Sequence, residues 1–341
     1  MKRVVDFGNK RRSIKMCIRD RNMRRILCIG DLCADLIIPY GEAKRNLALI
    51  RQGIIGSRQV ELRSGGTAGN TAAVLGKLGE RPVFVTDLCR DRLGTFLKGE
   101  MERYGVDMSM SPAGERGAMV CIAVVEENGD RTMFSWIPPG AGYPTFSADS
   151  FRPELFLTDS LIFTGGMSLN NDSCSMKAVR DFVAEMKEKT DSLFVFDLNT
   201  RIETYGLSEE RRKYYGEMIR LADVVLGSGI EEFGPLTGKD TLGEAAASMA
   251  SENRCVIARD GKNPVMIVEK GRTDFVETEQ VSVVSTVGAG DTFNGAFLSA
   301  YNRGYSLKDC VKFANETAGY MISHPGHLEI PEDGAARLKK F

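Results

Sequence analysis

Seven short runs rich in Val, Ile, Leu and Phe recur along the chain and constrain its fold more than any other feature. Stretches whose apolar residues fall at helical spacing, such as residues 70–80 and 171–190, separate them. Near-continuous hydrophobicity is typical of strands buried on both faces, as in parallel sheets covered by helices. The alternation therefore predicts an α/β fold with a parallel sheet. The runs are residues 24–30, 81–87, 160–166, 192–199, 222–228, 254–259 and 264–271.

Two segments interrupt this alternation. Residues 118–136 hold two strand-like runs on either side of Asn128-Gly129. Because Asn-Gly readily adopts the positive φ angles of a tight hairpin turn, this segment predicts an antiparallel strand pair. Residues 37–66 also lack the rhythm of helices and strands. Together the two segments predict a small β flap over a site at one edge of the sheet.

The charge balance bears on the partners of the chain. Its 341 residues include 45 Lys and Arg and 46 Asp and Glu, which gives a formal net charge of -1. Such a chain has no basic surface for nucleic acid and no polybasic membrane anchor. No apolar run approaches the ~18–20 residues that span a bilayer. We therefore expect no nucleic-acid or membrane partner, and a small neutral or anionic ligand.

The cysteines indicate a cytoplasmic protein with reduced thiols. Eight cysteines are scattered without a Cys-x-x-Cys pair, and the two histidines stand at no zinc-ligand spacing. The first 22 residues are basic and have neither apolar periodicity nor the hydrophobic core of a secretory signal. Part of this segment resembles a translated sequencing adaptor. We expect the natural chain to start at Met23, with a basic tail or transit-like peptide as the alternative.

A glycine turn lies between a strand-like run and a helical pattern in residues 283–301. Gly288 and Gly290 would let the backbone approach a phosphate, and the free N–H groups of a helix N-terminus bind anions. Asp291 follows directly and has two possible roles. It could cap the helix, or it could accept a proton from a hydroxyl that attacks the phosphorus.

Residues 285–297, STVGAGDTFNGAF, resemble the C-terminal signature of the ribokinase-like (PfkB) carbohydrate kinases, Asp-Thr-x-Gly-Ala-Gly-Asp-x-Phe-x-Gly-Ala. The resemblance implies that Asp291 contacts the sugar and is the catalytic base. It also implies that the amides of Gly288, Ala289 and Gly290 form the anion hole for the γ-phosphate of ATP.

The resemblance implies a fold as well. This is a ribokinase-like three-layer α/β/α domain with a mostly parallel central sheet and a small β lid. Residues 23–341 would form the domain, and residues of about 37–63 and 116–136 the lid. The lid strands of this family often pair between subunits, so a homodimer through the lid is a further expectation.

The sugar site is implied by three other matches. Residues 64–79 resemble the N-terminal signature of the family, in which the equivalents of Gly65, Gly66 and Asn70 touch the sugar. Residues 28–39, CIGDLCADLIIP, resemble the opening strand of the family, in which an Asp at the place of Asp35 binds sugar hydroxyls. A carboxylate can accept two hydrogen bonds from neighbouring hydroxyls; the alternative is that Asp31 and Asp35 simply end a strand. Residues 196–201, FDLNTR, resemble an Asp-x-Asn-x-Arg run. Its Asn199 and Arg201 are candidates for contacts with phosphate or a substrate carboxylate.

The nucleotide site departs from the family pattern in several places. Ser228 stands where Asn is usual, while Glu231 holds the place of a Glu that organises Mg²⁺ water. The usual Thr-x-Gly-x-x-Gly loop reads here as residues 258–263, without the Thr and both glycines. His324 and His327 are expected at the surface or beside the adenine. The cofactor-binding candidates are Asn199, Ser228, Glu231, Ala258, Asp260, Gly261, Lys262, Gly290 and Asn315.

Ser285 replaces the first Asp of the C-terminal signature. In many members this Asp helps to hold a K⁺ ion that stabilises the anion-hole loop. A neutral serine is a poorer ligand for a monovalent cation, so we expect little activation by K⁺.

The resemblance implies ATP- and Mg²⁺-dependent phosphorylation of a hydroxyl on a small sugar or sugar acid. One alternative is a nucleoside kinase, for which Phe134 and Trp136 are the obvious candidates for an aromatic platform under the base. Another is a catalytically idle ligand-binding protein on the same fold, given the altered nucleotide loop.

Overall fold

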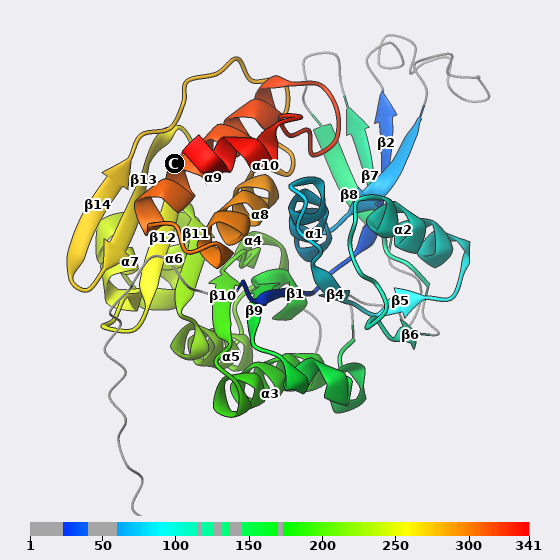
Figure 1. The fold of residues 1–341 in the computed structure, drawn as a ribbon, viewed down its shortest axis with the longest axis horizontal. Coiled ribbons are helices and arrows are strands. Elements are labelled where there is room, and N and C mark those ends of the chain that lie inside the picture. Colours follow the sequence, from blue (N-terminus) through cyan, green and yellow to red (C-terminus); the bar gives the residue numbers. More distant parts are fainter. Residues whose placement is uncertain are drawn as a thin grey trace, which may run out of the picture.

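The computed structural model describes residues 23–39, 60–114, 117–125, 131–136, 145–169 and 173–340. The expectation for residues 1–22 lies outside these ranges. Helices cover both faces of a central sheet, and a smaller sheet lies beside this body (Figure 1).

The central sheet has eight strands in the order β14-β13-β12-β11-β10-β9-β1-β4. From β12 to β4 every neighbouring pair is parallel. The predicted parallel sheet is thus confirmed for six of the seven hydrophobic runs. The strands are β1 (Arg25–Ile29), β4 (Val83–Val85), β9 (Ser160–Gly165), β10 (Leu193–Asp197), β11 (Val224–Ser228), β12 (Cys255–Asp260), β13 (Asn263–Glu269) and β14 (Arg272–Val276).

The parallel prediction is wrong for the seventh run, β13, which pairs antiparallel with both β12 and β14. Two tight turns cause the reversal. The chain turns at Gly261, where φ is 56°, and again at Lys270 and Gly271, where φ is 48° and 72°. Positive φ at two successive residues is the conformation of a type I′ hairpin turn. The strand β14 was not predicted, because most of its side chains are polar and exposed.

Alternating side chains of the strands build two cores. Ile26 and Cys28 of β1 pack with the first group of helices, and Leu27 and Ile29 pack with the second. The first group is α1 (Thr67–Lys77), α8 (Ala289–Asn302) and α9 (Leu307–Ser323). The second group is α3 (Ser173–Lys189), α5 (Glu209–Leu221), α6 (Gly229–Thr237) and α7 (Leu242–Met249).

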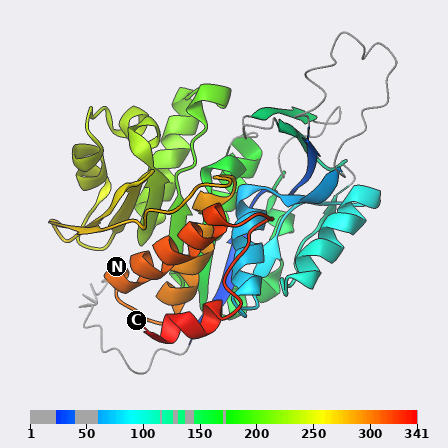
Figure 2. The same cartoon turned by 90° about the horizontal axis from the view of Figure 1, so that it is seen from above.

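The lid sheet has the strand order β3-β2-β7-β8. Its antiparallel pair β7/β8 confirms the predicted hairpin, although residues 126–130 at the turn lie outside the described ranges. In Figure 2 the blue and cyan lid strands and the yellow strands of the central sheet lie on opposite sides of the molecule. The strands are β2 (Cys33–Pro39), β3 (Glu61–Gly65), β7 (Val120–Val125) and β8 (Arg131–Trp136), and α2 (Arg92–Arg103) packs beside them.

The remaining described elements are short. They are β5 (Leu88–Cys89), β6 (Ala113–Gly114), α4 (Ile202–Tyr205), α10 (Gly334–Arg337), η2 (Ala148–Ser150), η3 (Pro153–Leu157), η4 (Gly166–Leu169) and η5 (Leu338–Lys340).

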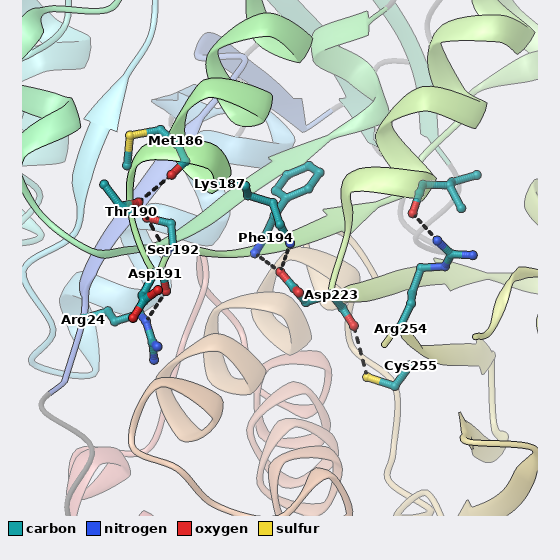
Figure 3. Close-up of polar contacts among 11 residues, drawn as sticks. Arg24, Met186, Lys187, Thr190, Asp191, Ser192, Phe194, Asp223, Arg254 and Cys255 are labelled. Atoms are coloured by element: carbon teal, nitrogen blue, oxygen red, sulfur yellow. Dashed lines mark hydrogen bonds and ion pairs between the residues drawn. The ribbon is translucent and has the colours of Figure 1, made fainter. Parts of the chain in front are cut away.

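Polar contacts fasten the strands where they begin (Figure 3). Asp223 precedes β11 and accepts hydrogen bonds from the Phe194 N–H at 2.7 Å and the Lys187 Nζ at 2.6 Å. Arg24 precedes β1 and reaches the Asp191 carbonyl at 3.1 Å. These contacts fix the amino ends of the strands. Ligands of open α/β sheets bind at the carboxyl ends, so we expect the ligand site there.

Among the described residues, no helix is both long and apolar enough to cross a membrane.

Candidate active site

Polar side chains converge where the parallel strands end. Asp31 follows β1, Asp197 ends β10 and Ser228 ends β11. The N-termini of α1 and α8 meet this edge, and Asn70 of α1 lies within hydrogen-bond distance of Asp291 of α8. Ligands of open α/β sheets bind outside the carboxyl ends of the strands, so this edge is the candidate active site.

Asp31 holds the start of α1. Its carboxylate accepts hydrogen bonds from the backbone N–H groups of Thr67 at 2.8 Å and Ala68 at 3.1 Å. Burial raises the pKa of Asp31, and these two hydrogen bonds act in the opposite direction. At Gly66, φ is 95° and a Cβ atom would lie 2.6 Å from the Asp31 carbonyl oxygen. Gly66 is therefore required for the turn into α1.

Asp35 and Gly65 lie together on the lid strands β2 and β3. A Cβ atom on Gly65 would collide with the Asp35 carboxylate. The glycine therefore leaves room for this carboxylate on the face of the lid sheet that bears Cys33 and Cys121. Burial raises the pKa of Asp35, while the nearby Arg63 guanidinium lowers it.

Asp291 is paired with Asn70. The Asn70 Nδ2 donates to Asp291 Oδ2 at 2.8 Å, which joins two residues 221 positions apart. Asn70 is buried. Within the described part of the chain, its Oδ1 atom has no hydrogen-bond partner. An amide oxygen in this position can accept a hydrogen bond from a ligand hydroxyl.

The pKa of the Asp291 carboxyl lies near neutral pH. Burial raises its pKa to about 7 from the ordinary value of 3.8, and the negative charges of Asp31 and Asp197 act in the same direction. The Asn70 hydrogen bond and the Arg259 guanidinium oppose the shift. A carboxylate with a pKa near the working pH is suited to general-base catalysis.

At the glycine turn before α8, the Ala289 N–H donates to the Thr286 carbonyl at 3.2 Å. Gly288, with φ of 82°, is the N-cap residue, and no side chain caps the helix. Asp291 lies in the first turn of α8. The alternative role of Asp291 as a helix cap is therefore wrong. The amides of residues 288–290 stand at the positive end of the helix dipole, where an anion is favoured.

Sequence reasoning missed the function of Arg259. This buried side chain lies one residue before the end of β12. It donates from Nη1 to the Gly290 carbonyl at 3.1 Å and to Asn294 Oδ1 at 3.0 Å. Its Nη2 atom pairs with Asp197 Oδ1 at 3.2 Å, and Asn294 Nδ2 donates to Asp197 Oδ2 at 2.6 Å. Arg259 thus ties β10 and β12 to the first turns of α8.

The Asp-x-Asn-x-Arg run begins at Asp197, the last residue of β10, and continues in a strained conformation. Both Asn199 and Arg201 have positive φ, 28° and 46°, a conformation that costs energy for residues other than glycine. Asn199 is buried and donates from Nδ2 to Thr67 Oγ1 at 2.7 Å. The exposed Arg201 is close enough to Asp31 to lower the pKa of that carboxyl.

At the start of α6, the carboxylate of Glu232 points toward the end of β11. Its Oε2 accepts the Ser228 N–H at 2.7 Å. Burial and the charge of Asp197 raise its pKa to about 8. Glu231, the residue expected from the sequence, is exposed instead. Neighbouring helix positions point about 100° apart, and the Glu231 carboxylate lies instead against Gly229.

A cavity of about 420 Å³ extends from the N-terminus of α8 between the β12–β13 turn and α9. Of the predicted cofactor-binding residues it is lined by Ser228, Gly261, Lys262, Gly290 and Asn315. Its lining does not include Asn199, Glu231, Ala258 or Asp260. The Ala258 side chain packs in the hydrophobic core.

Ser285 and the two histidines have local roles. The Ser285 Oγ accepts the Val287 N–H at 3.3 Å, which stabilises the turn before α8. His324 is exposed and stacks on Tyr320. His327 instead lies toward the lid, where burial and the charges of Arg63 and Lys77 lower its pKa to about 3.

Residues 23–333 match the model of the family described as pfkB family carbohydrate kinase. The chain belongs to the pfkB family of carbohydrate kinases. It is therefore a phosphotransferase that acts on a sugar hydroxyl.

Two curated relatives span most of this kinase. It is 28% identical over 316 residues to the probable fructokinase-2 of Arabidopsis thaliana, with 87% of this chain and 93% of the relative covered. It is 24% identical over 287 residues to the 5-dehydro-2-deoxygluconokinase of Clostridium tetani, with 81% and 83% covered.

A solved structure confirms the fold of the kinase. A putative ribokinase II from E. coli, in complex with ATP and Mg²⁺, superposes with a TM-score of 0.76 at 18% identity. The match covers 93% of this chain and 99% of that one. The ribokinase-like fold expected from the sequence is thus confirmed.

Proposed function

We propose that this kinase transfers the γ-phosphoryl group of ATP to a hydroxyl of a small sugar or sugar acid, with Asp291 as the base. One observation carries the assignment of the base. Asp291 is held by Asn70 at the uncapped N-terminus of α8, at one end of the 420 Å³ cavity. A proton acceptor and an anion site therefore stand side by side, as in-line phosphoryl transfer requires.

The lid side of the site would hold the sugar. The Asp35 carboxylate, which lies against Gly65, and the unpaired Oδ1 of Asn70 could each accept hydrogen bonds from sugar hydroxyls. Hydrogen bonds to these two acceptors would direct a third hydroxyl toward Asp291. Asp291 then removes the proton of this hydroxyl as its oxygen attacks the phosphorus.

The cavity side would hold the nucleotide. Small residues at Ala289 and Gly290 leave room for phosphates at the helix N-terminus, and Asn315 lines the far part of the cavity. The inward carboxylate of Glu232 would hold the water shell of Mg²⁺. When bound with ATP, Mg²⁺ neutralises part of the phosphate charge. The amides of residues 288–290 would stabilise the charge that develops on the transferred group.

Arginine side chains near the site favour a substrate that carries a carboxylate. Arg201 and Arg63 act electrostatically on Asp31 and Asp35, respectively. A guanidinium can bind a carboxylate through two parallel hydrogen bonds. The curated relative named 5-dehydro-2-deoxygluconokinase makes sugar acids a natural class to test.

The strand register argues against Phe134 as the platform for a nucleoside base. Phe134 pairs with Ile122, whereas the neighbouring Cys121 pairs with Asp35. Because successive side chains of a strand point to opposite faces, Phe134 lies on the face opposite Asp35. Phe134 would therefore not supply a platform for a base bound beside Asp35.

A substrate screen tests the proposed function. Sugars, sugar acids and nucleosides are compared by thermal shift with and without Mg·ATP, and the hits are assayed for ADP release. We expect ADP release with a sugar or sugar acid. Release only with nucleosides would contradict the proposal, and binding without any ADP release would indicate an idle ligand-binding protein.

We further propose that residues 23–341 act as one kinase domain in the cytoplasm, where ATP is abundant. All seven described cysteines are free thiols, which agrees with a reducing compartment.

A further inference from the structure

Three potential metal ligands meet on the face of the lid sheet that bears Asp35. They are Cys33 and Asp35 of β2 and Cys121 of β7. The two Sγ atoms are 3.8 Å apart, and Cys33 Sγ lies 3.4 Å from Asp35 Oδ1. All three ligand atoms lie within 4.8 Å of one another. No local sequence motif signals this cluster, because its third member comes from a strand 88 residues away.

These spacings match a tetrahedral ion. With metal–sulfur distances of about 2.3 Å, two thiolates at a tetrahedral angle stand about 3.8 Å apart. With a metal–oxygen distance of about 2.1 Å, a carboxylate oxygen and a thiolate stand about 3.6 Å apart. Both values lie close to the observed distances of 3.8 Å and 3.4 Å. The cluster could therefore close around an ion with small side-chain movements.

The donor set selects the ion. Two thiolates with one carboxylate favour soft or borderline cations such as Zn²⁺ and Cd²⁺ over Mg²⁺, which prefers oxygen ligands in an octahedral arrangement. The surroundings add negative charge, since Asp31 is close enough to act on both thiols. Cys33 is buried and Cys121 half-buried, so the ion would have limited contact with water.

We propose that Cys33, Asp35 and Cys121 form a binding site for a thiophilic divalent cation of the Zn²⁺ class, which displaces the two thiol protons into solution as it binds, and that this cation competes with the sugar. The competition rests on the proposed function, because Asp35 would be both a metal ligand and a ligand of sugar hydroxyls. A carboxylate whose oxygen ligates the ion is no longer free to accept the hydrogen bonds of the substrate. The occupied site thus inhibits the kinase by raising its KM for the sugar.

Metal binding is measured first, without any assay of activity. The reduced, metal-free full-length chain is titrated with Cd²⁺, and the thiolate-to-metal charge-transfer band is followed in the ultraviolet. We expect saturation at one ion per chain. Cys33→Ser and Cys121→Ser should each abolish or strongly weaken the band, whereas Cys174→Ser, at an exposed cysteine of α3, should leave it unchanged.

Two results would overturn the metal site. One is the absence of a band in the unaltered chain, and the other is a band that survives in both Cys33→Ser and Cys121→Ser. Circular dichroism of the two variants shows whether they fold. If one variant fails to fold, the other carries the test.

Competition is measured next with the substrate found in the screen. At a Zn²⁺ concentration of ten times its Kd, the KM for the sugar should rise about tenfold, as expected for one site shared by two ligands. The kcat should stay constant, and a chelator should restore the original KM. In Cys121→Ser the Zn²⁺ effect on KM should disappear.

The two proposals can fail separately. Binding of Cd²⁺ without a change in KM would refute the competition and leave the metal site intact. A chain that binds Cd²⁺ but releases no ADP with any sugar would instead refute the proposed function.

Discussion

At the scale of single residues, Asp291 is the proposed base, and its burial makes ionisation unfavourable. Its pKa of about 7 shows that the folded protein favours the protonated form relative to a free carboxyl. As the proposed base, Asp291 must be ionised, so its surroundings disfavour the form that the proposed reaction needs. Such strain between stability and function is common at active sites.

Replacing Asp291 by Asn should separate binding from catalysis. The amide keeps the size of the side chain but cannot take a proton. We expect kcat to fall on the order of 10²–10⁴-fold, as for loss of a general base, while sugar and ATP still produce thermal shifts. Asp274→Asn, at an exposed position of β14, serves as the control and should keep full activity. An Asp291→Asn enzyme with unchanged kcat would show that another group is the base.

The pH dependence of activity should report the same carboxyl. Only the carboxylate can accept a proton, so kcat/KM should fall as the pH drops through about 7. Well below that value the loss approaches about tenfold per pH unit. A kcat/KM that stays flat from neutral pH down to the ordinary pKa of an aspartic acid would contradict this assignment.

The stability of the folded kinase should fall as the pH rises, whereas its activity should increase. Because the folded-state pKa of Asp291 is raised from 3.8 to about 7, ionisation of this group costs stability as the pH rises through that window. Asp291→Asn removes the cost. The variant should therefore melt above the parent protein at pH 8, and the difference in Tm should shrink toward pH 4. Equal Tm differences at both pH values would mean that Asp291 is not the titrating group.

Ser285 bears on the expected response to K⁺. Its hydroxyl accepts the Val287 N–H and so is already used within the turn. We expect similar kcat values in K⁺, in Na⁺ and without either ion. Ser285→Asp should introduce activation by K⁺, because a carboxylate is a better cation ligand. Strong K⁺ activation of the unaltered kinase would refute the expectation.

At the scale of secondary-structure elements, Arg259 joins the central sheet to α8. It contacts Gly290 in the first turn of α8 and pairs with Asp197 of β10. The guanidinium therefore fixes the orientation of the glycine turn relative to the strands. The position of Asp291, one residue later, depends on the same contact.

Arg259→Met should damage both stability and turnover. Removing one partner of a buried ion pair leaves an uncompensated charge and costs about 3–5 kcal/mol. In denaturant unfolding, the double variant Arg259→Met/Asp197→Asn should recover part of this loss. The kcat should remain low in both, because each lacks the contact to Gly290. A single variant with parental kcat would show that α8 needs no such anchor.

The strands could be predicted from the sequence, whereas several contacts between elements could not. Hydrophobic runs identified the strands because burial on both faces requires continuous apolar side chains. The run of β13 could not reveal its antiparallel direction, which depends on two tight turns. The Arg259 network joins residues 62 and 35 positions apart, so no local pattern marks it. Glu232 was not predicted, because its neighbour Glu231 stands at the place of the family's Glu.

At the scale of the whole molecule, the described part of the lid sheet is incompletely covered. Its terminal strand β8 pairs with β7 on one side only. Phe134 on this strand is 53% exposed, and Leu62 of β3 at the opposite end of the sheet is 43% exposed. An edge strand with exposed apolar side chains is suited to pairing with another chain. These features support the expectation of a homodimer through the lid.

Light scattering after size-exclusion chromatography should therefore give the mass of a dimer for the kinase. Phe134→Lys should shift the mass toward the monomer, because a dimer through the lid would have to bury the new charge. Phe275→Lys is the matched control, since Phe275 is 55% exposed on β14, the terminal strand of the central sheet. A dimer that survives Phe134→Lys but dissociates in Phe275→Lys would place the interface at the central sheet.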